Sequence, residues 1–442
     1  RFIIVRENMN NQYEAIVIGG GIVGACISFE LAKAGRQVLC IDKNPAAGYG
    51  STGNSCAIIR THYSTLDGAA LALSNYPYWE NWSEYLESED ELGLIKYTEV
   101  GCIYTCFAEN NYGEKLVEIA DTLGIPYEIW SPEVMRKRVS IIDPGNYYPA
   151  RLPEDSKFGE PIGEMKHVIF FPKAGFISDP QLATHNVQRA AEAHGASFRF
   201  SDRVIAIEKE NGHVSGVSTE SGITYQANIV VNAAGPHSYL VNELAGVTNG
   251  MSIKTRALRV EVAHIPSPEG FDFEADGIIG SDANIGGYYR PETGNHILVG
   301  SEEPECDGLD WVDPDNYNQD VSNQARVQAM RAAQRFPRMN IPNNVKGIVD
   351  LYDVTDDWIP IYDVSDLKGF YMAIGTSGNQ FKNAPVVGKM MAALIDYVEK
   401  GSDHDKNPLR FKLPNVENYH QDLRFFSRRR EINRDSSFSV VG

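Results

Sequence analysis

Residues 14–42, EAIVIGGGIVGACISFELAKAGRQVLCID, decide the fold. The apolar run EAIVIGG predicts a buried strand, and VGACISFELAKAG has the spacing of a helix that ends at Gly35. RQVLCID predicts a second buried strand. A strand, a helix and a strand in this order form a βαβ unit, in which the two strands run parallel in one sheet. We therefore expect an α/β fold.

Three glycines lie between the first strand and the helix. Gly19, Gly21 and Gly24 form G-x-G-x-x-G, and Asp42 closes the second strand. The first glycine allows a tight turn, the second lets a pyrophosphate approach the backbone, and the third lets helix and strand pack closely. The helix N-terminus attracts phosphates, and Asp42 can accept hydrogen bonds from a ribose. This spacing predicts a dinucleotide site; a glycine turn needed only for packing is the alternative.

Two later segments favour FAD over NAD. Residues 228–236 (NIVVNAAGP) predict a strand that ends in small residues, and residues 375–388 (GTSGNQFKNAPVVG) predict a glycine turn before a helix. An NAD site needs no such return of the chain to the cofactor near residue 380. Each segment taken alone could be an ordinary strand or turn.

Composition excludes several other classes of protein. With 40 Lys and Arg against 59 Asp and Glu, the formal charge is −19, which argues against nucleic-acid binding. The six cysteines have no metal-ligand spacing, so we expect free thiols, no metal site and a reducing compartment. No apolar run is long enough for a membrane span, and residues 1–12 do not form a signal peptide. We expect a cytoplasmic protein with an N-terminal extension.

The pattern along the chain predicts two interleaved domains. Nucleotide-domain patterns occur at the start, middle and end of the chain and enclose β-rich segments, while residues 140–172 are rich in Pro, Gly and charge and predict an irregular excursion or lid. The expected ranges are 14–90, 173–245 and 345–400 for the cofactor domain, 91–172 and 246–344 for the substrate domain, and 401–442 for a C-terminal extension.

The order of four motifs resembles the D-amino-acid-oxidase superfamily of flavoproteins. These motifs are GGGIVG, GSTGNSCAIIRTHY, NAAGP and GTSGNQFKNAPVVG, and the chain looks most like the sarcosine oxidase branch from about residue 14 to residue 400. The resemblance implies a Rossmann-like FAD-binding domain interleaved with a β-sheet-rich substrate domain. It also implies oxidation of a small amine or amino acid (N-methyl, cyclic, D or L) by hydride transfer to the flavin. The imine product is then hydrolysed, and O2 or another carrier accepts the electrons.

In that branch, the residues that match Arg60 and Lys382 hold the substrate carboxylate. Two cations far apart in sequence, each beside a cofactor segment, can converge on one carboxylate; surface charges are the alternative. Tyr63, Tyr288 and Tyr289 resemble the aromatic walls of the pocket, although packed core tyrosines would also fit. The residues expected to contact FAD are Gly19, Gly21, Gly24, Asp42, Lys43, Ser51, Val204, Ala234, Gly235, Gly375, Gly378 and Lys382.

Two departures from that branch change the expectations. Asp350 stands where sarcosine oxidase attaches its flavin to a cysteine, residues 51–56 contain no histidine, and Cys56 and His62 are unsuitable attachment points, so we expect noncovalent FAD. Leu298, near His296, stands where a lysine promotes reaction with O2, which weakens the interpretation as an oxidase. An FAD-dependent hydroxy-acid or polyol dehydrogenase, and a flavin-binding subunit of a larger complex, remain alternatives.

Overall fold

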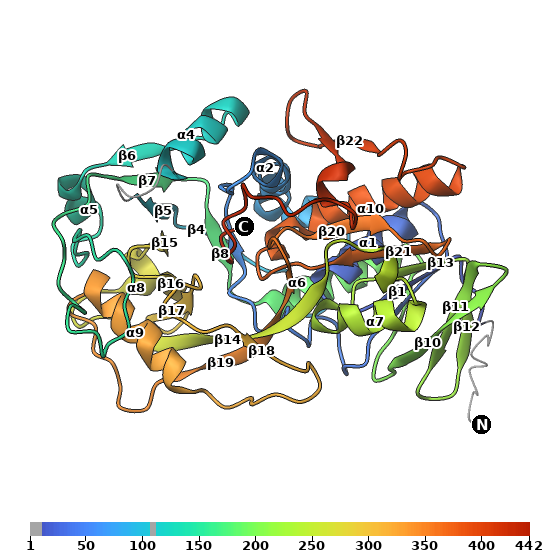
Figure 1. Ribbon diagram of the computed structural model, residues 1–442, viewed down its shortest axis with the longest axis horizontal. Coiled ribbons are helices and arrows are strands. Elements are labelled where there is room, and N and C mark those ends of the chain that lie inside the picture. Colours follow the sequence, from blue (N-terminus) through green and yellow to red (C-terminus); the bar gives the residue numbers. More distant parts are fainter. Residues whose placement is uncertain (1–10, 107–111) are drawn as a thin grey trace.

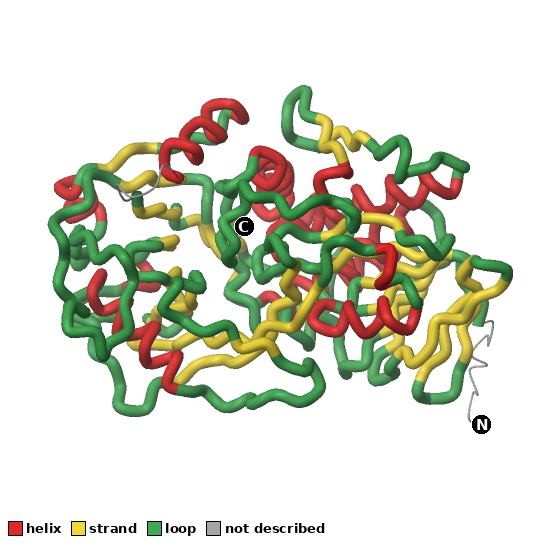
Figure 2. The backbone as a smooth tube through the Cα atoms, viewed as in Figure 1, coloured by secondary structure: helices red, strands yellow, loops and turns green. Residues whose placement is uncertain are grey.

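The computed structural model describes residues 11–106 and 112–442. Two large sheets dominate the molecule, one on each side of the view in Figure 1. Figure 2 shows that helices lie against the sheet on the right, whereas loops make up much of the left end. No helix in the described ranges is long and apolar enough to cross a membrane.

The first sheet is the one predicted from residues 14–42. Its strand order is β20-β21-β13-β1-β2-β9, and all neighbouring pairs are parallel except β20 and β21. The strands are β1 (Ala15–Ile18), β2 (Val38–Ile41), β9 (Ser197–Arg199), β13 (Ile229–Asn232), β20 (Ile361–Val364) and β21 (Phe370–Ile374).

Alternation along β1 explains how this sheet is covered on both faces. Ala15 and Val17 pack toward the helices α1, α6 and α10, whereas Ile16 and Ile18 pack toward a small three-stranded sheet and α7. The covering elements are α1 (Ile22–Lys33), α6 (Pro180–Ala193), α10 (Ala384–Glu399), α7 (Ser238–Ala245), β10 (Val204–Glu210), β11 (His213–Thr219) and β12 (Thr224–Gln226).

The second sheet has nine strands, in the order β18-β14-β17-β16-β15-β5-β7-β6, with β19 also paired to β14. One face packs on α9 (Asn323–Arg335). The strands are β5 (Cys102–Thr105), β6 (Glu128–Trp130), β7 (Val168–Phe171), β14 (Thr255–Pro266), β15 (Ile279–Asp282), β16 (Gly287–Glu292), β17 (His296–Ser301), β18 (Asp310–Trp311) and β19 (Lys346–Thr355).

Shorter elements join the two sheets and border them. They are β3 (Ile58–Ile59), α2 (Leu66–Glu80), α3 (Trp82–Leu86), β4 (Tyr97–Glu99), α4 (Tyr112–Leu123), α5 (Pro132–Arg138), β8 (Gly175–Ile177), η1 (Gly235–His237), η2 (Thr248–Gly250), α8 (Phe273–Asp276), η3 (Phe381–Asn383), β22 (Arg410–Lys412), β23 (His420–Asp422) and η4 (Leu423–Phe426).

Two expectations about chain organisation need correction. The boundary at residue 345 is misplaced, because β19 pairs with β14 along its whole length and so belongs to the nine-stranded sheet. Residues 140–172 do not form a lid over the large cavity described below, and none of them lines it. Instead, the buried Arg335 donates hydrogen bonds to the carbonyls of Asp143 and Gly145, which fixes this excursion against α9.

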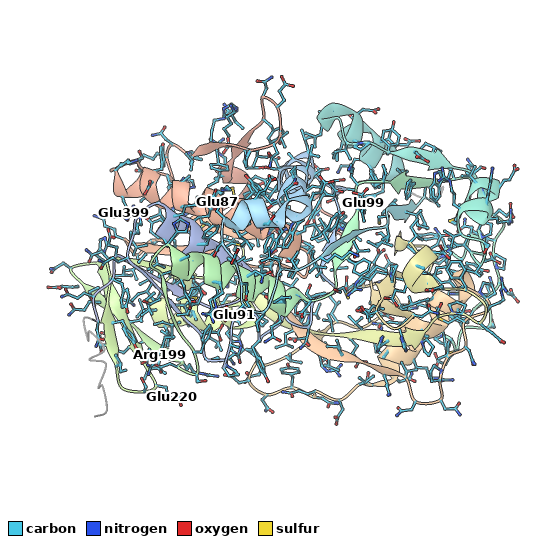
Figure 3. All side chains as sticks on the ribbon, turned by 180° about the vertical axis from the view of Figure 1, so that it is seen from behind. Glu87, Glu91, Glu99, Arg199, Glu220 and Glu399 are labelled. Carbon is cyan, nitrogen blue, oxygen red and sulfur yellow. The ribbon has the colours of Figure 1, made fainter. Side chains whose placement is uncertain are left out.

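The surface reflects the excess of acidic residues. From behind, the exposed residues Glu87, Glu91, Glu220 and Glu399 lie on the side of the first sheet, with Arg199 among them, and Glu99 lies nearer the middle of the molecule (Figure 3). Any anion-binding site must therefore be built from local cations against an unfavourable average field.

Candidate active site

A cavity of about 1130 Å³ runs between the two large sheets. The N-terminus of α1 lines the cavity, and so do Arg60 and Lys382. Both sheets contribute residues to the lining, so the site lies where the two parts of the fold face each other.

Each glycine of the G-x-G-x-x-G motif is required at its position for a steric reason. A Cβ on Gly19 would lie 2.2 Å from the carbonyl oxygen of Ala233, and one on Gly24 would lie 1.9 Å from the carbonyl oxygen of Gly19. These two glycines therefore allow β1, β13 and α1 to pack closely. Gly21 instead borders the cavity at the N-terminus of α1, where it leaves room for a phosphate group.

Asp42 is held in place at the end of β2. Its carboxylate accepts hydrogen bonds from the backbone N–H groups of Gly20 (2.6 Å) and Asn44 (2.7 Å), and it lines the cavity beside the glycine turn. Burial raises the pKa of Asp42, and the two N–H groups oppose that shift. The oriented carboxylate retains lone pairs that can accept hydrogen bonds from ribose hydroxyls.

Lys43 takes part in a bridge across the cavity. Asp315, in the segment 314–319 that follows β18, lies 3.0 Å from Lys43, 2.7 Å from Arg203 and 2.9 Å from the Nε2 atom of His237. These partners belong to the cofactor side of the molecule, whereas residues 314–319 come from the nine-stranded sheet. The bridge therefore connects the two sides over the cofactor end of the cavity.

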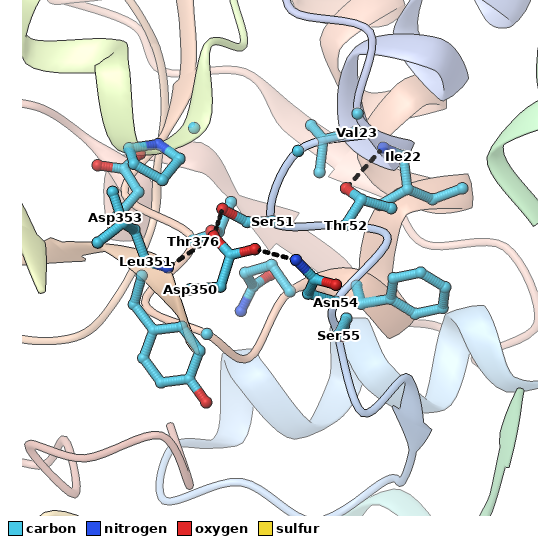
Figure 4. Close-up of a pocket in the computed structure, with 18 of the residues that line it drawn as sticks. Ile22, Val23, Ser51, Thr52, Asn54, Ser55, Asp350, Leu351, Asp353 and Thr376 are labelled. Atoms are coloured by element: carbon cyan, nitrogen blue, oxygen red, sulfur yellow. Dashed lines mark hydrogen bonds between the residues drawn. The ribbon is translucent and has the colours of Figure 1, made fainter. Parts of the chain in front are cut away.

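Ser51 and Asp350, which both line the cavity, meet there side by side (Figure 4). Asp350 accepts hydrogen bonds from the hydroxyl of Ser51 (3.1 Å) and the side-chain amide of Asn54 (2.6 Å). In the same loop, the Thr52 hydroxyl accepts a hydrogen bond from the N–H of Ile22 (3.2 Å). The loop 51–54 is thus fixed to α1 on one side and to β19 on the other.

The other predicted cofactor residues divide into two groups. Val204, Ala234, Gly235 and Gly378 line the cavity. Gly375 does not line the cavity, and its N–H group donates a hydrogen bond to Asp353 (2.6 Å). The expectation that Gly375 contacts FAD is therefore corrected. A Cβ there would lie 2.2 Å from Thr355, so this glycine is required for packing of the turn.

Arg60 and Lys382 converge on the ring of Tyr63. The guanidinium carbon of Arg60 lies 4.5 Å from the ring centroid and the Nζ of Lys382 lies 5.2 Å from it. Lys382 also donates to the Tyr63 hydroxyl (3.1 Å) and to the carbonyl of Asn379 (2.7 Å). Arg60 is 7% exposed and Lys382 is 4% exposed. Within residues 11–106 and 112–442, neither forms an ion pair.

The two basic side chains affect each other electrostatically. Burial, with a further contribution from Arg60, holds the pKa of Lys382 well below its usual range. Burial raises the pKa of Tyr63 to about 12, although Arg60 opposes that shift. An anion bound between Arg60 and Lys382 would offset both effects on the lysine and favour its charged form.

A segment near the end of the sequence covers this part of the cavity. Arg60 donates hydrogen bonds to the carbonyls of Val440 (3.3 Å) and Val441, and the N–H of Ser64 donates to the carbonyl of Gly442 (2.9 Å). In Figure 1 the chain end marked C lies between the two parts of the molecule. Nothing in the motifs indicated this contact.

Only one of the two adjacent tyrosines of β16 reaches the cavity. The Tyr288 hydroxyl lies 3.5 Å from the sulfur of Cys56 and 3.4 Å from the hydroxyl of Tyr352, and all three residues line the cavity. Tyr289 packs on Phe336 in the core beneath α9. The expectation that both tyrosines wall the pocket is corrected, because successive strand residues face opposite sides of a sheet.

Sequence reasoning also missed Glu302. This residue follows β17, lines the cavity together with Arg60, and accepts a hydrogen bond from the Ser281 hydroxyl (2.6 Å). It is 7% exposed. Leu298 and His296, by contrast, do not line the cavity. The available signal was an acidic residue directly after a buried strand, which is too common a pattern to single out one glutamate.

The glycine turn, the oriented Asp42 and the cavity between the sheets define a dinucleotide-binding protein. The chain belongs to the family of FAD-dependent oxidoreductases: the family model described as "DAO: FAD dependent oxidoreductase" matches residues 14–394. The predicted family and α/β fold are therefore confirmed, and FAD is the cofactor. Gly21 and the start of α1 would hold the FAD phosphates and Asp42 the ribose, while FAD supplies the capacity to accept two electrons.

Individual relatives are distant but cover nearly the whole chain. Glycine oxidase of Geobacillus kaustophilus is 24% identical over 89% of this chain and 96% of its own length. Sarcosine oxidase subunit beta of Rhizobium meliloti is 24% identical over 87% of this chain and 84% of its own length. Among solved structures, L-proline dehydrogenase of P. horikoshii superposes with a TM-score of 0.73 at 22% identity, covering 94% of this chain and 97% of that one. The likeness to that structure concerns the fold.

Proposed function

We propose that this protein oxidises a small amino acid at its amine-bearing carbon or N-methyl carbon, with FAD as the electron acceptor. The observation that carries this proposal is the pair Arg60 and Lys382. Both side chains are buried, line the cavity and lie near the ring of Tyr63, and neither has an ion-pair partner within the described ranges.

The electrostatics favour a carboxylate ligand. Burying a cation without a partner is costly, and an anion in direct contact offsets that cost. Arg60 can form paired hydrogen bonds with a carboxylate, and Lys382 can add a third. The amino-acid or amine substrates named for glycine oxidase, sarcosine oxidase and L-proline dehydrogenase agree with this chemistry.

The carbonyls of Val440 and Val441 occupy part of the same position. They are neutral acceptors, so a carboxylate would form stronger charge-assisted bonds with Arg60. We propose that substrate replaces these carbonyls as the partner of Arg60.

Anaerobic titration of the FAD-loaded protein tests the function directly. Glycine, sarcosine, proline and D- and L-amino acids are added separately, and bleaching of the flavin absorbance is followed. Pyrrolidine and methylamine, which lack the carboxylate, serve as matched controls and are expected not to reduce the flavin. Reduction by lactate or another hydroxy acid, but by no amino acid, would establish the hydroxy-acid alternative. A flavin that no compound reduces would favour the subunit alternative.

Arg60→Ala and Lys382→Ala test the proposed clamp. Each is expected to weaken substrate binding by about 2–5 kcal/mol, because a charge-paired contact is lost in a buried site. The exposed Arg199→Ala is the matched control for removal of a positive charge. FAD content is measured in every variant, and unchanged substrate affinity in both cavity variants would contradict the clamp.

A further inference from the structure

We propose that Glu302 binds the amino group of the substrate and accepts a proton from it before oxidation. This inference rests on the proposed function and deepens it, since it defines the substrate as a zwitterion held at both of its charged ends. Glu302 would then be a catalytic residue, because its carboxylate would contact the reacting nitrogen.

The first support is position. Glu302 lines the cavity together with Arg60 and Lys382 and is close enough to Arg60 for the two charges to interact. It follows β17 of the nine-stranded sheet, whereas Arg60 follows β3 and Lys382 lies in η3. The hydrogen bond from Ser281, on β15 of the same sheet, fixes the Glu302 carboxyl group. A ligand with its carboxylate at Arg60 would therefore have its other polar group facing the strands that carry Glu302.

The second support is the balance of charge. Arg60, Lys382 and Glu302 are all buried, and within the described parts of the chain none of them forms an ion pair. Two basic groups and one acidic group, each hydrogen-bonded only to neutral protein groups, match a small ligand that carries a carboxylate and an ammonium group. Bound together, the ligand and the protein would leave few uncompensated charges in the cavity.

The surroundings of Glu302 make it a suitable proton acceptor. Burial, with a smaller contribution from Asp282, raises the pKa of Glu302 to about 8, although the Ser281 hydroxyl and Arg60 oppose that shift. Asp282 itself is paired with Arg335 at 2.7 Å. The other titratable groups that interact with Glu302 from the elements around it are Cys102, Tyr104, Tyr112, Tyr289 and Glu303.

The proposed step balances in protons and electrons. The substrate ammonium loses one proton to the Glu302 carboxylate, which leaves a neutral amine with a free lone pair. This lone pair would form the C=N bond as the adjacent C–H bond breaks, and bound FAD would supply the acceptor for the hydrogen and its electron pair. Only the carboxylate form of Glu302 can accept this proton, and an ammonium group bound beside it favours that form. A carboxylate whose pKa is raised is a stronger base than that of an ordinary glutamate.

Glu303 provides a matched control one residue away. Its carboxylate is also buried, and burial raises its pKa to about 8. It accepts a hydrogen bond from the N–H of Val440 (3.1 Å) and does not line the cavity. Glu302→Gln and Glu303→Gln thus remove the same charge from neighbouring positions, only one of which faces the proposed substrate.

The experiment measures anaerobic flavin reduction between pH 6 and 10 by the amino acid that best reduces the wild-type protein. For Glu302→Gln we expect a rate about 10²–10⁴-fold lower near pH 7, the usual effect of losing a general base. The deficit should shrink as pH rises toward the pKa of the free amino acid, because neutral amine then becomes available from solution. Glu303→Gln should retain the wild-type pH profile, and Glu302→Asp should recover part of the rate.

Propionate, a carboxylate without an amine, separates this inference from the clamp. Its Kd, measured from perturbation of the flavin spectrum, should be no weaker in Glu302→Gln than in wild type. A Glu302→Gln variant with the wild-type rate and pH profile would overturn the role of Glu302 and leave the proposed function intact. If no amino acid reduces the wild-type flavin, both proposals fail. FAD content and far-UV circular dichroism show whether Glu302→Gln is folded. If it is misfolded, the inference requires Glu302→Asp to show a shifted pH profile.

Discussion

The guanidinium of Arg60 donates a hydrogen bond to the carbonyl of Val441, which lies 381 residues further along the chain. Val440 accepts a second bond from the same nitrogen. The side chain proposed to hold the substrate carboxylate is therefore already bonded to a segment of the protein itself. Substrate and segment 436–442 compete for Arg60 if the proposed clamp is correct.

Deleting residues 436–442 should therefore tighten substrate binding. A hydrogen bond to a charged group contributes about 1.5–3 kcal/mol, so we expect the substrate Kd to fall by about tenfold or more. The Kd is measured by anaerobic titration of the flavin absorbance. Phe438→Ala is the control within the segment, because Phe438 is 42% exposed. Weaker substrate binding after the deletion would show that the segment helps to form the site.

FAD should be bound without a covalent link. Asp350 faces the cavity and bonds to Ser51 and Asn54, while His62 lies outside the cavity lining and stacks on Phe171. Acid precipitation should therefore release all of the yellow colour into the supernatant. Cys56 lines the cavity, so Cys56→Ser is the relevant control and should behave in the same way. Flavin that remains on the wild-type chain but not on this variant would identify Cys56 as the attachment point.

Reduced enzyme should react more slowly with O2 than with a dye or quinone. In the resemblance to the sarcosine oxidase branch, Leu298 matches the oxygen-activating lysine. Leu298 lies outside the cavity lining, and its neighbour Arg290 is paired with Glu292 at 2.9 Å. A cation next to the flavin stabilises developing superoxide, and each 1.36 kcal/mol of lost stabilisation slows the reaction about tenfold. Stopped-flow reoxidation in air-saturated buffer checks this prediction. If reoxidation is fast, Lys382→Met tests whether Lys382 supplies the charge.

His62 should make the protein sensitive to acid. Burial, with smaller contributions from Arg60 and Lys382, holds the pKa of His62 well below its ordinary value of 6.5. Below pH 6.5 the unfolded chain therefore binds a proton that the folded protein does not, so stability is retained above that pH and lost as pH falls. Over the range from pH 6.5 to pH 5 the loss is at most about 2 kcal/mol, the limit for a folded protein that takes up no proton in that range.

His62→Phe should remove this loss, because a phenyl ring can replace the imidazole that stacks on Phe171 at 4.7 Å. Urea unfolding of the FAD-loaded protein at pH 5 and pH 8 measures the difference. The exposed His420→Phe is the control and should leave the pH dependence unchanged. If His62→Phe and the wild-type protein lost the same stability between pH 8 and pH 5, other titratable groups would be responsible for that loss.

The βαβ unit could be predicted because its strands, its helix and its glycine turn all lie within residues 14–42. Arg60 and Lys382 could be selected because each lies inside a recognisable motif. The pairing of β19 with β14 could not be predicted in the same way, since it joins residues about a hundred positions apart. The same limit applies to Glu302, whose environment comes from β15 and from Arg60. Tyr289 was misplaced because two adjacent tyrosines on a strand leave open which one faces the pocket.

The order of strands around β1 also has a consequence for biosynthesis. β1 pairs with β13, and β13 pairs with β21, so the cofactor sheet cannot close until residue 374 has left the ribosome. Until then β13 has an unpaired edge, which is prone to pair with other chains. A nascent chain therefore acquires its flavin late in translation or after it. Slower synthesis and ample riboflavin late in expression should raise the yield of yellow protein more than a longer induction would.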